Sequence, residues 1–177
     1  MSISHLSLVN QKLAFASALL TNLNPVTTAL TTTQKLQQKA LTDAVVFHLI
    51  TALHFYTREL AELQRVKNLS AINSVRDLVI ALEQMEGASS EVSELLALTQ
   101  TDNAWLSQLT GYYRQLFQSP EKPKERKSFG QENLIEFVEL TEAEGQTPLQ
   151  LTPELLVSWL DSFRALVARQ RETNAEY

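Results

Sequence analysis

Apolar side chains recur at alternating steps of three and four residues in four separate segments of this chain. This spacing places them along one stripe of an α-helix, and such a stripe is buried against other helices. The pattern predicts an all-α fold, but it carries no information about chemistry. The clearest series lies in the second segment: Val46, Leu49, Leu53, Tyr56, Leu60 and Leu63.

The four segments predict an antiparallel up-down bundle of four long helices, followed by a C-terminal helix. The first two helices span about residues 4–23 and 33–67, the third ends near Gly87, and the fourth covers about residues 89–116. The first three connections are short, which favours helices that alternate in direction. An irregular loop of about residues 118–152 then precedes a last helix that begins at Pro153. We expect a single domain over residues 1–177.

Three helix boundaries carry specific signals. Thr31 followed by Gln34 is a candidate capping box, in which each side chain binds the backbone N–H of the other residue. Ser70 is the expected N-cap of the third helix. Thr99 and Asp102 are polar where the stripe of the fourth helix should be apolar. Two alternatives stay open there: one continuous helix, or two helices that break at residues 101–103.

Composition excludes several classes of function. The chain has no cysteine, so disulfides, thiolate nucleophiles and iron–sulfur clusters are excluded. Its net charge of −5 disfavours nucleic-acid binding, because an acidic surface repels phosphates. The most apolar stretch, residues 44–56, contains two histidines and is shorter than the roughly 20 residues of a membrane span, so we expect no membrane association. The N-terminus lacks a basic leader and an apolar run, which predicts a cytoplasmic protein.

The sequence predicts no catalytic, cofactor-binding or metal-binding residues. His48 and His54 are six positions apart on one helix, so they point to different faces and do not bind one ion together. We expect both to be hydrogen-bonded to a neighbouring helix. No sequence motif for phosphate binding or for a histidine-containing metal helix occurs.

Two groups of residues are candidates for a binding function. The first is a second apolar stripe on the fourth helix, which is either an exposed partner surface or is covered by the last helix and the long loop before it. The second is a candidate pocket near the middle of the second helix. The stripe consists of Trp105, Leu109, Tyr112 and Leu116, and the pocket of His48, His54, Tyr56 and Arg58.

The chain resembles a family of uncharacterised gammaproteobacterial helical proteins, a domain of unknown function. The resemblance implies a bacterial, cytoplasmic, all-α protein and supplies no reaction. It rests on residues 10–16, on Phe47-His48-Leu49 with Ala52, Leu53 and Tyr56, on Trp105-Leu106, and on Trp159 with residues 169–172.

The sequence thus favours a non-enzymatic binding or scaffold protein without a cofactor, which associates with a protein partner or with a second copy of itself. Association would use the apolar stripe of the fourth helix or the exposed start of the second. The alternative is a small-ligand-binding protein or a metal-independent enzyme with its pocket near the middle of the second helix.

Overall fold

Helices account for 80% of the residues that the computed structural model describes, and no strand occurs among them. The described residues are 4–23, 31–85, 87, 89–118 and 151–175, so the predicted loop of 118–152 lies almost wholly outside them. The all-α prediction is confirmed. The helices within these ranges are α1 (His5–Leu20), α2 (Thr32–Leu63), the short 3₁₀ helix η1 (Leu69–Ala71), α3 (Val75–Glu83), α4 (Ser90–Gln100), α5 (Trp105–Gln115) and α6 (Pro153–Ala175).

Only three of the described helices are long, so the predicted set of four long helices with a fifth behind them is not confirmed in detail. Helices α1, α2 and α6 have 16, 32 and 23 residues, whereas α3, α4 and α5 have 9, 11 and 11. The predicted fourth helix is divided into α4 and α5, which settles the alternative left open at residues 101–103. Thr101 is extended and Asn103 has a φ of 62°. Asparagine tolerates this left-handed conformation better than most residues do.

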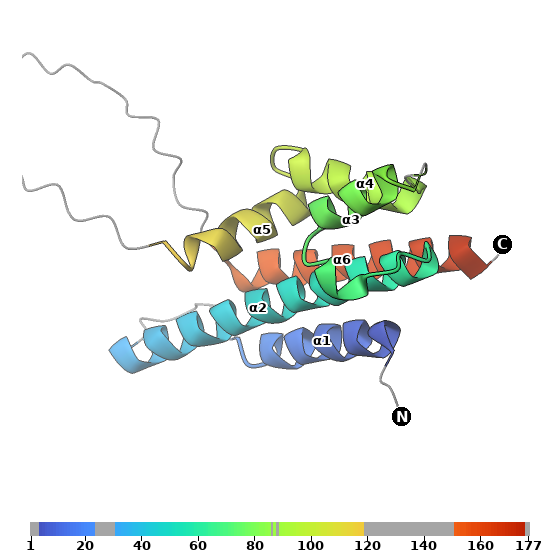
Figure 1. Cartoon of the computed structure of the whole chain (residues 1–177). Coiled ribbons are helices and arrows are strands. Elements are labelled where there is room, and N and C mark those ends of the chain that lie inside the picture. The colour runs from blue at the N-terminus through green and yellow to red at the C-terminus, as the bar shows by residue number, and fades with distance from the viewer. Residues whose placement is uncertain (1–3, 24–30, 86, 88, 119–150, 176–177) are drawn as a thin grey trace, which may run out of the picture.

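Helix α2 lies at the centre of the molecule (Figure 1). Helix α1 packs against it on one side, the short helices α3, α4 and α5 lie on the other, and α6 contacts α1, α2 and α5. Helix α6 runs in the same direction as α2, because Tyr56 pairs with Gln170 and Glu59 pairs with Arg171 further along both helices (Figure 1). The short helices α3, α4 and α5 follow one side of α2, and the candidate site lies between them and α2.

The predicted stripe of α2 is buried except at its last position, where Leu63 is half exposed. The helix ends at Leu63, four residues earlier than expected, because Arg65 adopts a left-handed φ of 58°. The N–H of Arg65 then donates to Glu62 O and that of Val66 to Ala61 O. This pair of bonds is the Schellman motif, which satisfies the last carbonyls of a helix.

The capping box at the start of α2 is confirmed. Gln34 N donates to Thr31 Oγ1, and Thr31 N donates to Gln34 Oε1 at 2.9 Å. The expectation that Ser70 caps α3 is wrong, since Ser70 lies in η1 and Ser74 accepts the hydrogen bond from Asp77 N at 3.1 Å. The sequence pattern predicted that α3 begins at these residues, but they form the 3₁₀ helix η1, and α3 begins only at Val75.

Helix α2 is long and apolar enough to cross a membrane when judged by length and composition alone. Within its apolar window 39% of the residues are buried inside the protein, and the core helix of a soluble protein passes the same test. This is weak evidence in either direction, so the absence of membrane association and the cytoplasmic location remain predictions.

Candidate functional site

His48 lies between α2 and α1, away from the other three residues of the predicted pocket. Its ring meets that of Phe15 edge to face, with centroids 5.4 Å apart. Its Nδ1 is buried and has no hydrogen-bond partner among the described residues, so the expected bond to a neighbouring helix is wrong for this histidine. Burial, with the nearby charge of Lys12, lowers the pKa of His48 below its ordinary value.

We expect acid to destabilise the protein in part through His48. Because its pKa is lower in the folded chain, the unfolded chain binds a proton first as the pH falls below about 6.5, which favours unfolding. The free energy of unfolding should therefore decrease between about pH 7 and about pH 5, and His48→Met should make that decrease smaller. Urea unfolding of both proteins across this range measures the difference, and equal slopes would contradict the assignment.

Tyr56 faces α6 rather than His48. The side chain is fully buried, and its hydroxyl donates to Gln170 Oε1 at 2.6 Å. Burial raises the pKa of Tyr56 most, and the negative charge of Glu59 raises it further. The phenol therefore remains protonated and serves as a hydrogen-bond donor in the core.

His54 and Arg58 lie on a third side of α2 and meet at the turn before α3. The Nε of Arg58 donates to Ile72 O at 2.9 Å and its Nη2 to Asn73 Oδ1 at 3.3 Å. His54 Nδ1 lies 3.2 Å from Asn73 O; a carbonyl only accepts, so this nitrogen carries the proton. The structure thus brings His54 and Arg58 together around one turn but does not bring the four predicted residues into one pocket.

A cleft of about 610 Å³ opens beside His54, between α2, the start of α3, the end of α4 and α5. This volume is within the range of roughly 300–1,000 Å³ that is usual for small-molecule sites. Leu53 and Val75 form a buried apolar floor, flanked by Ile50 and the ring of Tyr113. The turn that Arg58 holds supplies one wall, so Arg58 is a positioning residue for the cleft.

Four threonine hydroxyls line the same cleft, and each is already used as a donor. They donate to carbonyls of their own helices, at 2.7 Å for Thr51 to Phe47 O and 2.7 Å for Thr99 to Leu96 O. Thr57 and Thr110 donate to carbonyls three and four residues earlier in the same way. Thr57 is fully buried, whereas the partly exposed hydroxyl oxygens of the other three threonines keep lone pairs that can accept a hydrogen bond.

Two arginines stand at the rim of the cleft, Arg76 on α3 and Arg114 on α5. Within the described part of the chain, neither forms an ion pair, whereas Arg164, Arg169 and Arg171 each pair with a carboxylate. Among the described residues that line this cleft there is no aspartate or glutamate. Sequence analysis identified His54 here but missed the arginines, because only the packing of α3 and α5 on α2 brings them together.

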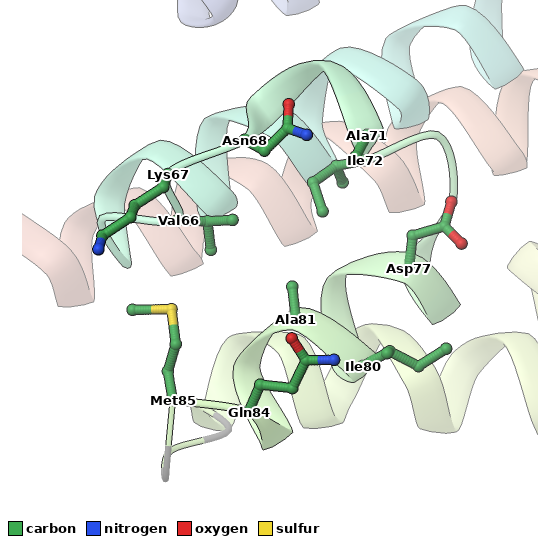
Figure 2. Close-up of a pocket in the computed structure, with 10 residues that line it drawn as sticks. All are labelled: Val66, Lys67, Asn68, Ala71, Ile72, Asp77, Ile80, Ala81, Gln84 and Met85. Atoms are coloured by element: carbon green, nitrogen blue, oxygen red, sulfur yellow. The ribbon is translucent and has the colours of Figure 1, made fainter.

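A second hollow, of about 770 Å³, lies between the end of α2, η1 and α3 (Figure 2). Apolar side chains such as Ile72, Ile80 and Met85 face it. Its two charged residues, Lys67 and Asp77, are far apart at its edges and do not converge on one point (Figure 2). This groove therefore lacks the convergent polar groups that orient a small ligand.

The predicted partner stripe of α5 is mostly turned toward the protein interior. Leu109 is fully buried, and Trp105 packs on Phe163 of α6 with ring centroids 5.5 Å apart. The hydroxyl of Tyr112 donates to Asp43 Oδ1 at 3.1 Å, and Leu116 is partly buried. Trp105 is thus covered by α6 and Tyr112 contacts α2, while a partner surface on this stripe remains a prediction.

An exposed aromatic cluster lies beside that stripe and was not predicted. Tyr113 contacts Phe47 of α2 at 6.1 Å and Phe117 at 5.1 Å between ring centroids. Phe47 and Phe117 are 53% and 71% exposed. The sequence signal was weak, because Phe47 occupies a flank of a helix that is apolar on nearly every side.

The fold and the cleft together define an all-helical protein with an apolar cleft and a basic rim. The chain belongs to a family of unknown function, DUF6586, whose model matches residues 1–177. The resemblance noted from the sequence is thereby confirmed, while the bacterial origin remains a prediction. No curated protein and no solved structure matches the chain.

Proposed function

We propose that the protein binds a small molecule in the cleft between α2, α3, α4 and α5. The observation that supports this function is the combination of an apolar floor with polar groups that line the cleft from three elements: His54, Arg76 and Arg114. Ligand sites generally consist of a concave apolar surface with a few such groups that fix orientation.

The expectation of a scaffold protein with a partner on the α5 stripe has less support. Leu109 is in the core and Trp105 packs against α6, so a partner would meet only part of the predicted surface. The exposed start of α2, with Leu36 at 71% exposure, remains available for association with a partner or a second copy. No feature of the described residues supports a protein partner or a dimer as specifically as the cleft supports ligand binding.

We expect Thr110→Trp to block the cleft and to weaken ligand binding by roughly tenfold or more, because the indole would occupy the ligand's space. The probe is anilinonaphthalene sulfonate, an apolar fluorophore whose emission rises in apolar surroundings. Fluorescence titration of the full-length protein measures its affinity.

Gln115→Trp is the matched control, since Gln115 is exposed on the same helix and does not line the cleft. It should leave the affinity unchanged. Circular dichroism verifies that both variants are folded. Equal affinity of Thr110→Trp and the unaltered protein would show that the probe binds elsewhere and would contradict the proposed function.

A further inference from the structure

We propose that the ligand of the cleft is an amphipathic organic anion, with a carboxylate or phosphate head held by Arg76 and Arg114 and an apolar body on the floor. This inference rests on the proposed function and adds the ligand's chemical class. It depends on the placement of charge around the cleft, on the apolar floor and on the direction of the threonine hydroxyls.

The charge argument begins with the two guanidinium groups. The protein has a net charge of −5, yet the cleft lining, as far as the structure describes the chain, includes two arginines and no carboxylate. Arg114 Nε donates to Thr110 O at 3.3 Å, which fixes one end of its guanidinium near the cleft. Arginine binds carboxylate and phosphate through paired N–H groups, and an opposite charge is the partner that two unpaired guanidinium groups favour.

The nearest carboxylate on α3 does not neutralise this rim. Asp77 accepts the hydrogen bond from Asn73 N at 3.0 Å and lines the groove on the other side of α3. The first turn of α3, at Val75 and Arg76, faces the cleft instead. Asp77 lies in the first turn of α3 and compensates the partial positive charge of this helix N-terminus, so the attraction for an anion comes from the two arginines.

The floor and the hydroxyls define the remainder of the ligand. Leu53 and Val75 are almost fully buried and offer no polar atom from their side chains, so they favour an apolar body. The hydroxyls of Thr51, Thr99 and Thr110 offer only lone pairs, because each proton is already donated to a carbonyl, and Thr57 is fully buried. The cleft thus favours a ligand that also carries an O–H or N–H group between its anionic head and its apolar end.

The test compares two probes of similar shape. Anilinonaphthalene sulfonate is an anion, and N-phenylnaphthylamine is its neutral counterpart. We expect the anion to bind more tightly, and we expect Arg76→Gln and Arg114→Gln each to weaken it about tenfold, which is the usual effect of losing one charge-assisted hydrogen bond. The same variants should change the affinity of the neutral probe less than about twofold, and added salt should weaken only the anion.

Arg164→Gln is the matched control, because it removes the same charge from an exposed position on α6 outside the cleft. It should leave both affinities unchanged. Displacement of the bound probe by octanoate or octyl phosphate, and not by octylammonium, would support the assignment and would identify the head group.

Three outcomes separate the inference from the function on which it rests. If Thr110→Trp weakens binding of both probes but the arginine variants bind the anion normally, the cleft binds ligands and the anionic class is wrong. If octylammonium displaces the probe as effectively as octanoate or octyl phosphate does, the assignment of an anionic ligand is also wrong. If Thr110→Trp has no effect, the proposed function itself fails.

Discussion

Phe163→Ala is expected to lower the free energy of unfolding by about 3–5 kcal/mol, the usual cost of removing a large buried ring. Phe163 is fully buried in α6 and contacts two other rings, with centroid distances of 6.2 Å to Tyr56 of α2 and 5.5 Å to Trp105 of α5. The substitution would leave a cavity where three helices meet. A domain is typically stable by only about 5–15 kcal/mol, so a large share of the total would be lost.

Chemical unfolding followed by circular dichroism measures this loss. Val157→Ala is the matched control on the same helix, because Val157 is 44% exposed and its truncation should cost less than about 0.5 kcal/mol. Phe163→Leu should recover part of the stability by filling some of the cavity. A loss below about 1 kcal/mol for Phe163→Ala would mean that α6 does not pack on α2 and α5 through this ring.

The position of Phe163 in the core was predictable from the sequence, because helical spacing is a local property. The last helix has apolar residues at the same steps of three and four, and all of them are buried: Leu156, Trp159, Phe163 and Leu166. The capping box of α2 was predictable for the same reason, since Thr31 and Gln34 are three residues apart. Features that depend on neighbours within about one helical turn can be read from the chain alone.

The cleft was only partly predictable. His54 was correctly placed near the middle of α2, but the directions in which His48 and Tyr56 point depend on where α1 and α6 pack. Arg76 and Arg114 are 38 positions apart and reach one rim only because α3 and α5 both pack on α2. Sequence spacing carries no information about such distances, and an isolated arginine usually indicates a solvent-exposed surface.

Polar side chains near the C-terminal end of α6 connect this helix to its neighbours, which the sequence did not predict. Gln170 is buried, accepts from Tyr56 and donates to Glu91 O at 3.3 Å and Glu94 Oε2 at 2.8 Å. One amide thereby connects α6 to both α2 and α4. Residues 169–172 were among those that carried the resemblance to the family, and this network gives a physical reason for these side chains.

Arg171→Ala is expected to destabilise the protein by about 3 kcal/mol, because it leaves a nearly buried carboxylate without its partner. Arg171 binds both oxygens of Glu59, at 2.7 and 2.8 Å, and Nη1 donates to Asn10 Oδ1 at 2.9 Å. The side chain of Glu59 is only 9% exposed, so water cannot replace the lost bonds. The arginine joins α1, α2 and α6, and its removal affects all three contacts at once.

The neighbouring arginine provides the matched control for this prediction. Arg169 pairs with Glu94, but its side chain is 63% exposed, so Arg169→Ala should cost less than about 1 kcal/mol. The double variant Glu59→Leu, Arg171→Leu should recover much of the stability lost in Arg171→Ala, because no unpaired charge would remain buried. Equal and small losses for the two arginine variants would show that the Glu59 pair lies in water. A double variant as unstable as Arg171→Ala would instead assign the loss to the packing of the arginine side chain.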